Sequence, residues 1–556
     1  MSTFSKANIV ADETFNRWLV PPISISIHLC IGSVYAWSMF NPALTKILGV
    51  ASSAAGDWTL SDVIWIFSTA IIFLGMAAAF AGKWLEEVGP RLVGFVAACL
   101  WGGGFLVGSM GIFFHELSLV YLGYGVLGGC GLGLGYVSPV STLIRWFPDR
   151  RGMATGMAIM GFGGGAMIGA PLISYLLDLF HVAPVYLGSA NDLILKTIDG
   201  VRFAEINGML TEIVVVTTVE AQNSIYEAGV YVVGSGDTGA GMTFVSLGLG
   251  YFLIMAIASF GYRIPPENWK PKGWDESMRK NNTSPVTSEN VHIDEALKTP
   301  QFYFLWIVLC FNVTAGIGVL GVAKTMMSDI FSNALPTIVN TSFAATYVLM
   351  ISAFNMIGRF FWASTSDYIG RKNTYYIFFI LGILLYTSIP FAASEMSINP
   401  SVVLLIYFYA ATMIIFTMYG GGFATIPAYL ADIFGTKYVG GIHGRLLTAW
   451  STAGVIGPLA ITTLRSNSIE KAIMDLSQKV DPKKFSDLFG DTIDNISQLI
   501  VTKTVTIPKL MSIAPEDTND PTSTLYNSTM FLMAFLLAIA LLANYLIKPV
   551  DSKHHM

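Results

Sequence analysis

The stretch NMIGRFFWASTSDYIGRK, residues 355–372, places one arginine inside a long apolar run and then ends that run in a charged turn. Arg359 is the unusual residue, because a guanidinium deep in a bilayer costs about 2.5–3.5 kcal/mol on insertion scales. Such a residue by default faces an interior cavity and marks a functional site. The alternative is that its side chain extends to the membrane interface or caps a helix. Asp367 lies about 12 Å further along the helix, and this separation favours the interior placement.

The composition is that of a protein with many membrane spans. Of its 556 residues, 53% are hydrophobic and only 12% are charged, whereas soluble domains carry roughly 25% charged residues. The mean hydropathy is +0.61. The four cysteines lie in apolar runs, so we expect no disulfide framework, no metal site and no cofactor.

Apolar runs of about 20 residues, long enough to cross a bilayer, predict an all-α integral membrane protein with twelve transmembrane helices in two six-helix pseudo-repeats. We place the runs near residues 18–46, 60–82, 91–113, 117–144, 151–180, 239–262, 300–327, 343–365, 373–393, 401–431, 440–464 and 528–547. The predicted domains are an N-terminal half at 1–263, a cytoplasmic linker at 264–299 and a C-terminal half at 300–556.

Basic residues gather in alternate loops, and this pattern predicts the orientation. Arg145 and Arg151 lie in one such loop, Lys437 lies in another, and the short loops between them hold almost no basic residues. Because positive residues favour the cytoplasmic side, we expect both termini in the cytoplasm of a plasma or inner membrane.

The two halves resemble each other in sequence, which predicts an internal repeat. The loop after the second helix and the loop after the eighth share the spacing acid-x-x-Gly-x-basic. We expect these charged turns to latch the inner side closed, with the glycines permitting the tight turn. The residues of the two turns are Glu86, Gly89 and Arg91, and Asp367, Gly370, Arg371 and Lys372.

Two insertions interrupt the helical pattern on the predicted outer face. Residues 182–238 alternate in places between apolar and polar side chains, which predicts short strands. Residues 466–526 favour amphipathic helices near 469–480 and 485–500. We expect the two insertions to dock on each other as a cap; the alternative is that they are unrelated surface additions.

Several motifs carry a resemblance to a known family. They are RWFPDRRGMATG (145–156), GRFFWASTSDYIGRK (358–372), YAWS (35–38), YGGGFATIPAYLADIFG (419–435) and GRLLTAWSTAGVIGP (444–458). With the paired turns, they resemble the major facilitator superfamily, and more narrowly its oxalate/formate antiporter family, which is related to the monocarboxylate transporters. The resemblance covers all twelve predicted helices but neither insertion. It implies a secondary transporter whose helix 8 arginine, here Arg359, pairs with the substrate carboxylate.

This sequence departs from both related groups at the residues that accompany the arginine. The resemblance implies a lysine in helix 11 of oxalate carriers for a second carboxylate, and Trp450 stands at that position here. In animal monocarboxylate carriers it implies an aspartate one helical turn before the arginine, where this chain has Asn355. Arg359 thus offers one positive charge, and its planar fork can bind both oxygens of one carboxylate.

Further candidates for the substrate site are aromatic and lie well inside the predicted helices. Packing alone is the alternative explanation for each of them, because aromatic residues commonly pack in membrane bundles. The tyrosines and the tryptophan offer an O–H or N–H as well as a ring, whereas the phenylalanines offer only shape. These residues are Tyr35, Tyr136, Phe162, Tyr419, Phe423 and Trp450.

His28 and His443 are candidates for proton coupling, because histidine titrates near neutral pH. A neutral, hydrogen-bonded histidine is the alternative for each.

The leading hypothesis is secondary transport of a small monocarboxylate of the formate, lactate or pyruvate type, by exchange or proton symport. The alternatives are an oxalate or dicarboxylate antiporter and a receptor on the same fold that does not transport. A membrane enzyme is disfavoured, because no nucleophile with a paired base, histidine-rich cluster or phosphate loop appears in or near the predicted spans. The expected partners are the carboxylate anion and the bilayer, with no nucleic acid, and the protein is expected to be monomeric.

Overall fold

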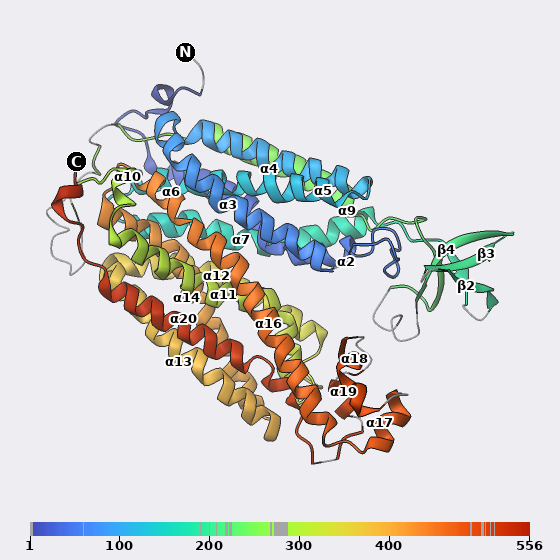
Figure 1. The fold of residues 1–556 in the computed structure, drawn as a ribbon. Helices are drawn as coiled ribbons and strands as arrows, with labels where there is room; N and C mark the ends of the chain where they lie inside the picture. Colours follow the sequence, from blue (N-terminus) through green and yellow to red (C-terminus); the bar gives the residue numbers. More distant parts are fainter. Residues whose placement is uncertain are drawn as a thin grey trace.

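The computed structural model is a bundle of long helices with a small β-sheet and a group of short helices at one end (Figure 1). It describes residues 4–58, 60–189, 192–198, 201–206, 208–216, 221, 225–266, 269–271, 287, 289–489, 492–501, 505, 507–511, 513–515 and 517–556. Both chain ends lie at the opposite end of the bundle. We call the end with the chain termini the terminal face and the end with the sheet the insertion face.

The helices coloured blue to green in Figure 1, up to α9, form one group, and those coloured yellow-green to red form the other. The first group consists of α1 (Val20–Gly32) with its 3-10 continuation (Ser33–Met39), α2 (Asn41–Leu44), α3 (Leu60–Val88), α4 (Pro90–Phe113), α5 (Leu117–Val120), a π-helical stretch (Tyr121–Gly128), α6 (Gly129–Trp146), α7 (Arg151–Phe180) and α9 (Ala240–Phe260). The second consists of α10 (Ile293–Ala296), α11 (Pro300–Phe331), α12 (Thr341–Ile369), α13 (Arg371–Ile398), α14 (Val402–Phe434), α15 (Val439–Leu446), α16 (Thr448–Ser477) and α20 (Asn527–Leu546).

Within the described residues, ten helices are long and apolar enough to cross a membrane. This set omits α3, which contributes a shorter apolar helix at Trp65–Ala81, and α12, which carries Arg359. These two are the second long helices of their halves, so the ten helices fit the predicted twelve-helix architecture. Half of the predicted linker, residues 267–268, 272–286 and 288, lies outside the described residues.

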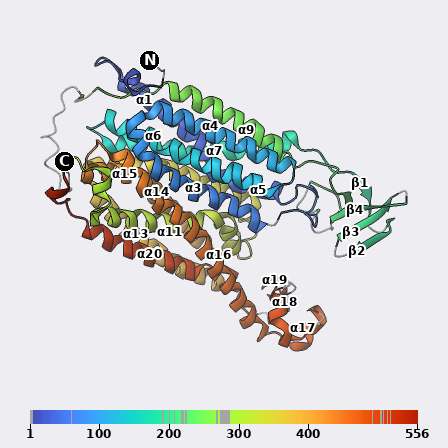
Figure 2. The ribbon, with the colours of Figure 1, turned by 45° about the horizontal axis from the view of Figure 1, so that its top comes forward.

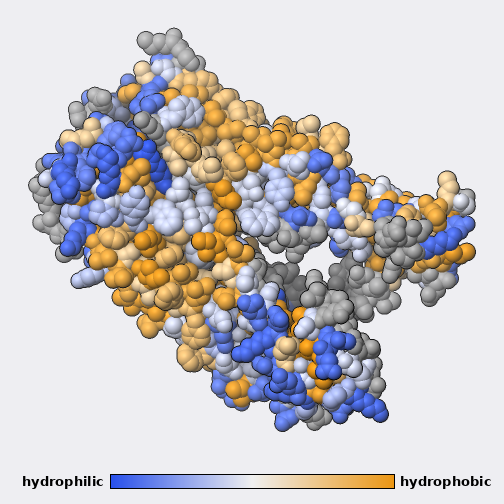
Figure 3. Space-filling view, in the orientation of Figure 1, coloured by the Kyte–Doolittle hydropathy of each residue, from blue (hydrophilic) through white to orange (hydrophobic). Residues whose placement is uncertain are grey.

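The flanks of the bundle are apolar, as a lipid-facing surface requires. Figure 3 shows orange residues along the visible sides of the helices and blue residues gathered near the terminal face and over α17 and its neighbours. Phe80, Phe391 and Phe535 are 80%, 70% and 62% exposed. Such side chains are stable in lipid rather than in water.

The first insertion forms the predicted strands. They are β1 (Tyr186–Gly188), β2 (Leu195–Ile198), β3 (Val201–Ile206), β4 (Met209–Val216) and β5 (Gly229–Val232), joined as an antiparallel sheet in the order β1-β5-β4-β3-β2. Alternation places Ile213 in one small core and Val214 in another, where Val214 packs with Ala51 and Ala54 from the loop before α3. The backbone N–H of Gly234 also donates to the carbonyl of Leu48 at 2.8 Å.

The second insertion differs from the sequence prediction at its start. We expected helix 11 to end near 464 and a separate helix to begin near 469, but α16 runs without a break to Ser477. Ala472, Ile473 and Leu476 are buried along this extension, and their spacing gives it an apolar face to pack. The helix then gives way to α17 (Pro482–Phe489), α18 (Ile496–Val501) and α19 (Ile507–Met511).

The two insertions do not form the expected cap within the described residues. The sheet and the α17–α19 group stand apart in Figure 1 and again in Figure 2, which turns the molecule by 45°. The sheet packs instead on the loop before α3. The second insertion is fixed to its own half, where Arg465 of α16 pairs with Asp329 of α11 at 2.8 Å and the Tyr526 hydroxyl donates to the same carboxylate.

Candidate functional site

Arg359 lies in the interior of the bundle and is completely buried. Its Nε donates to the Oδ1 of Asn355 at 3.1 Å, one turn earlier on α12. Its Nη1 donates to the main-chain oxygen of Ile159 on α7, at 3.2 Å, and therefore reaches across to the other half. The side chain neither extends to the interface nor caps a helix end, so the interior placement expected from the sequence is confirmed.

Two phenylalanine rings, one from each half, hold the guanidinium between them. The Arg359 carbon Cζ lies 5.5 Å from the ring centre of Phe162 on α7 and 5.5 Å from that of Phe423 on α14. A cation over an aromatic face is attracted by the ring quadrupole, most strongly where water is excluded. The rings thus stabilise the buried charge without neutralising it.

Trp450 of α16 lies at the centre of the aromatic residues that the sequence singled out. Its ring centre is 5.3 Å from Tyr136, 5.4 Å from Phe162 and 4.7 Å from Phe423. The Trp450 and Tyr136 side chains are fully buried. The fold therefore brings one side chain each from α6, α7 and α14 into contact with the indole on α16.

Tyr35 and Tyr419 close the cluster from opposite halves. Their hydroxyl oxygens lie 3.5 Å apart, and the Tyr35 ring packs edge-on to Phe162 at 5.0 Å. The Tyr419 ring packs edge-on to Phe423 at 5.4 Å. All eight predicted substrate-site residues consequently lie in one cluster, which we call the central cluster: Tyr35, Tyr136, Phe162, Asn355, Arg359, Tyr419, Phe423 and Trp450.

Three donors in the central cluster have no hydrogen-bond partner among the described residues. They are Arg359 Nη2, Tyr136 Oη and Trp450 Nε1, and all three atoms are buried. A buried polar group left unpaired costs about 1–3 kcal/mol. Arginine and tryptophan can only donate hydrogen bonds, and a tyrosine hydroxyl can do so as well. The arrangement therefore suits a ligand that accepts hydrogen bonds and carries negative charge.

The two histidines lie beside Tyr136 at the edge of the central cluster. The ring centres of His28 and His443 are 5.2 Å and 5.8 Å from that of Tyr136. His28 Nδ1 is 2.5 Å from the carbonyl oxygen of Ala158, and its Nε2 is 3.2 Å from that of Tyr136. Since both neighbours only accept, a neutral ring can donate to one of them and a protonated ring to both.

Asn312 is a site candidate that the sequence analysis did not single out. This α11 residue is buried, and its Nδ2 has no hydrogen-bond partner in the described part of the chain. It lines a small cavity together with Tyr419. A lone amide inside an apolar run is the same kind of signal that Asn355 gave, and it could have identified Asn312.

The charged turn after α12 joins the two halves at the terminal face. Both carboxylate oxygens of Asp367 accept hydrogen bonds from the first α7 amides, those of Gly152 and Met153, at 2.9 Å each. Arg371 pairs with Asp367 and lies 3.4 Å from Asp432 of α14. Asp432 also lies 3.3 Å from Arg151 of α7. A chain of alternating charges therefore holds α7 against the second half.

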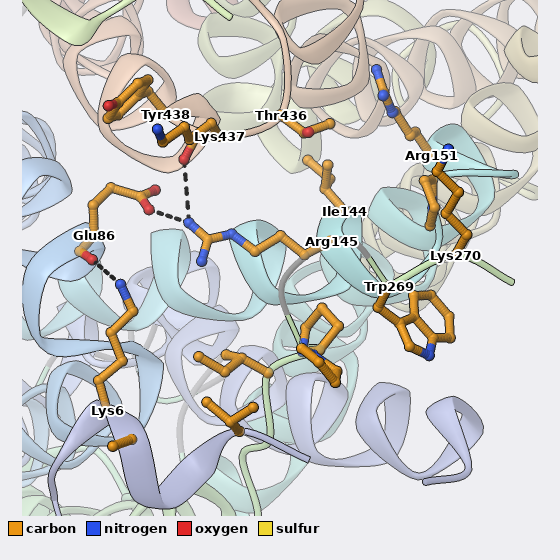
Figure 4. A pocket seen from close by; sticks show the side chains of 16 residues that line it. Lys6, Glu86, Ile144, Arg145, Arg151, Trp269, Lys270, Thr436, Lys437 and Tyr438 are labelled. Carbon is orange, nitrogen blue, oxygen red and sulfur yellow. Dashed lines mark hydrogen bonds and ion pairs between the residues drawn. The ribbon is translucent and has the colours of Figure 1, made fainter. Parts of the chain in front are cut away.

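The turn after α3 makes matching contacts, as an internal repeat predicts. Glu86 pairs with Arg145 of α6, and Arg145 also donates to the main-chain oxygen of Lys437 in the second half at 3.4 Å (Figure 4). Gly89 and Gly370 both have φ of +87°, the left-handed region that favours glycine.

The last basic residue of each turn fixes the end of the last helix in its half. Arg91 donates to the carbonyl of Tyr262, just after α9, at 3.3 Å. Lys372 donates to the carbonyl of Ile547, just after α20, at 2.7 Å. The correspondence between α9 and α20 supports the predicted repeat at the level of individual hydrogen bonds.

Known families and structures match this fold and these motifs. The family model described as Major Facilitator Superfamily matches residues 28–190 and 229–458. This chain belongs to the major facilitator superfamily. The match leaves out residues 191–228, which include most of the sheet insertion, and everything after Pro458.

Two curated relatives and one solved structure are similar to this superfamily member over most of its length. The oxalate:formate antiporter of Oxalobacter formigenes is 25% identical over 449 residues, covering 80% of this chain and 83% of the relative. Apicoplast pyruvate carrier 1 of Toxoplasma gondii is 23% identical over 465 residues, covering 76% and 78%. The fucose:proton symporter of E. coli has a TM-score of 0.54 at 10% identity, covering 94% of this chain and 97% of that one.

These similarities establish the general class of this superfamily protein. It is a multi-pass membrane transporter with the major facilitator fold, and not an enzyme. At 10% identity, the solved structure supports the fold alone. The predicted resemblance to the oxalate/formate antiporter family is confirmed.

Proposed function

We propose that this transporter moves a small monocarboxylate anion, of the formate, lactate or pyruvate type, by alternating access. The observation that carries the proposal is the set of three unpaired donors, Arg359 Nη2, Tyr136 Oη and Trp450 Nε1, within the described residues of a buried cluster between the halves. A carboxylate accepts several hydrogen bonds and carries the one negative charge that a single guanidinium neutralises.

The charge balance of the central cluster favours one carboxylate over two. Arg359 is its one cationic side chain, Asn355 adds an amide without charge, and Trp450 adds a neutral donor. A second carboxylate would enter a buried site with no cation to pair with it, and an unpaired buried charge is strongly unfavourable. The names of the relatives, an oxalate:formate antiporter and a pyruvate carrier, support the carboxylate class.

Arg359 also offers a physical link between substrate binding and the movement of the halves. Its Nη1 donates to Ile159 on the opposite half, so the guanidinium bridges the interface. A bound carboxylate that draws the guanidinium toward itself weakens this bridge. We infer that the substrate thereby loosens one contact between the halves and lowers the barrier to exchange between the two access states.

We propose either exchange or proton symport as the mode of coupling. His28 stands between two carbonyl oxygens, an arrangement that a protonated ring satisfies fully. A symporter would use this proton, together with His443, whereas an exchanger would need a second anion on the opposite side. Uptake driven by a pH gradient, or uptake that requires internal anion, distinguishes the two modes.

The orientation, domain bounds and oligomeric state follow from the same reasoning. We propose that the terminal face lies in the cytoplasm of a plasma or inner membrane, because the basic loops gather there. The halves are 1–263 and 300–556, with the linker between them, and the monomer is the working unit because the central cluster is built within one chain.

The test is uptake of labelled formate, lactate, pyruvate and oxalate into proteoliposomes. We expect uptake of at least one monocarboxylate, and we expect Arg359→Ala to reduce it by at least tenfold, since a lost buried ion pair costs several kcal/mol. Arg445→Ala is the control, because Arg445 lies on the terminal face and pairs with Asp294 at 3.0 Å. Uptake that Arg359→Ala leaves unchanged would refute the site, and uptake of none of the four anions would favour a receptor.

A further inference from the structure

A large cavity separate from the central cluster opens at the terminal face, between the two halves (Figure 4). Its volume is about 1000 Å³. The N-terminal segment, the ends of α3 and α6, the start of α7 and residues 264–266, 269 and 270 line it from the first half and the linker. The loop between α14 and α15 lines it from the second half. This volume is at the upper end for small-molecule sites and far exceeds the needs of a three-carbon acid.

The cavity is strongly cationic. Among the described residues, one carboxylate, that of Glu86, lines the cavity together with five basic side chains: Lys6, Arg145, Arg151, Lys270 and Lys437. Arg145 is neutralised by Glu86, and Arg151 by Asp432.

Three lysines in the cavity have no carboxylate partner within the described part of the chain. Lys6 Nζ donates to a main-chain carbonyl, that of Glu86, at 2.5 Å, and this bond does not neutralise it. Lys270 and Lys437 have no ion pair with any carboxylate among the described residues. Lys270 is exposed and points toward Arg151 in Figure 4. Positive charges gathered in a concave site with low-dielectric walls raise the local concentration of anions.

One wall of the cavity is apolar and suits an organic group joined to the anion. Pro265, Pro266 and Trp269 form this wall, and Trp269 is held by an edge-on contact with Trp146 at 4.9 Å. The lysines and this wall together are complementary to a compound with several negative charges and a compact organic part. Phosphate esters with two or more phosphates have this chemistry.

We propose that this cavity binds a polyvalent phosphate compound, such as a nucleoside triphosphate or a multiply phosphorylated lipid headgroup, and that the bound compound holds the terminal face closed. Lys6 and Lys270 belong to the first half and the linker, and Lys437 belongs to the second half. A phosphate chain that contacts all three must bridge the halves. Opening of the terminal face separates these lysines, so the ligand binds the closed state more tightly and shifts the population toward it.

The binding site stands independently of the transported substrate, whereas its effect on uptake rests on the proposed transport function. Transport requires the terminal face to open in each cycle. A ligand that binds the closed state more tightly therefore slows transport. The compound therefore inhibits transport from the terminal side of the membrane and has no effect from the insertion side.

The first test measures binding of tripolyphosphate and of ATP to the full-length protein in detergent by calorimetry. We expect Lys6→Gln, Lys270→Gln and Lys437→Gln each to weaken binding by about tenfold, a loss of one charged phosphate contact, and added salt to weaken it further. Lys548→Gln is the matched control, because Lys548 is an exposed lysine outside this cavity. The thermal midpoint of each unliganded variant shows that it remains folded.

A second arm uses nanodiscs with and without a phosphoinositide. If tripolyphosphate or ATP binds and this binding depends on the three lysines, the proposal is supported and the ligand is a soluble phosphate compound. If lysine-dependent binding occurs only in nanodiscs that contain the phosphoinositide, the proposal is supported and the ligand is a lipid headgroup. Binding that the triple lysine variant retains at full strength, or that Lys548→Gln weakens equally, overturns the proposal.

The regulatory part is tested by trapping tripolyphosphate on the terminal side of proteoliposomes. Slower uptake in the wild type, with normal uptake in the triple lysine variant, is the expected result. Equal uptake with and without trapped tripolyphosphate overturns this part while leaving the monocarboxylate proposal intact. Loss of uptake in Arg359→Ala tests that proposal separately.

Discussion

A single buried guanidinium gives the central cluster its chemical character. Arg359 makes two hydrogen bonds and lies between two phenylalanine rings, yet one of its nitrogens has no partner within the described structure. Its neighbour Asn355 accepts a hydrogen bond from Arg359, and Trp450 offers an unpaired N–H, and neither residue adds charge. The net charge of the cluster, and so the charge of its preferred ligand, therefore depends on residues that surround the arginine as much as on the arginine itself.

Substitution of one of those neighbours should change the preferred charge of the ligand. Trp450→Lys adds a second cation within the same cluster, so we expect oxalate uptake to appear or monocarboxylate uptake to fall by at least tenfold. Trp450→Phe is the control for the lost ring and N–H, because it keeps an aromatic group without adding charge. The measurement is uptake of oxalate and of pyruvate by the two variants in parallel. Unchanged selectivity in Trp450→Lys would contradict the role given to this position.

At the scale of elements, the two charged turns matter because each sets the angle between consecutive long helices. Gly89 joins α3 to α4 and Gly370 joins α12 to α13, each with φ of +87°. Asp367 then reaches α7 of the opposite half, whereas Glu86 pairs with Arg145 within its own half. The basic residues of the two turns fix the ends of α9 and α20. One short motif thus organises three contacts, which explains why its spacing occurs in both halves.

Alanine at one of these turns should destabilise the protein. Gly370→Ala forces an L-residue into the left-handed region, and we expect a loss of about 1–2 kcal/mol. Gly103→Ala is a matched control, because Gly103 lies in α4 and a Cβ there would meet no atom within 4 Å. The thermal unfolding midpoint in detergent measures both. A midpoint for Gly370→Ala equal to that of the wild type would show that the turn relaxes without strain.

At the scale of the whole molecule, the two insertions are attached to the bundle at separate places. The sheet packs on the loop before α3, and the α17–α19 group continues from α16, which is pinned by Arg465 and Asp329. Each insertion is therefore tied to its own half. The halves move relative to each other in alternating access. Because each insertion is attached to one half only, it can move with that half without breaking contacts to the other insertion.

Removal of one insertion should leave the other intact. We expect a variant in which a short glycine-serine linker replaces residues 186–232 to retain the wild-type pattern of protease resistance at 466–526. Limited proteolysis of membrane-embedded protein, followed by mass mapping, measures this. New cleavage within 466–526 would show that the insertions do protect each other. Arg465→Ala serves as the positive control, since loss of its bond to Asp329 should expose that insertion to cleavage.

Much of the central cluster could be predicted because each of its members is chemically unusual at its place in the sequence. An arginine, an asparagine and several polar aromatics inside apolar runs are costly unless they face an interior. The resemblance of motifs then indicated which of them share a site. Asn312 was missed although it carries the same signal, and the cationic cavity was missed because its lysines come from the N-terminal segment, the linker and a distant loop.

The sequence by itself determined the membrane class, the helix pattern, the repeat and the strands of the first insertion, because each rests on local hydrophobic length or periodicity. Only the tertiary structure decided what depends on distance between remote segments. It brought six segments of the two halves together in the central cluster, joined Asp367 to the start of α7, and kept the described parts of the insertions apart. It also carried α16 unbroken to Ser477, since burial of Ala472, Ile473 and Leu476 stabilises a helix that local polarity alone would have ended.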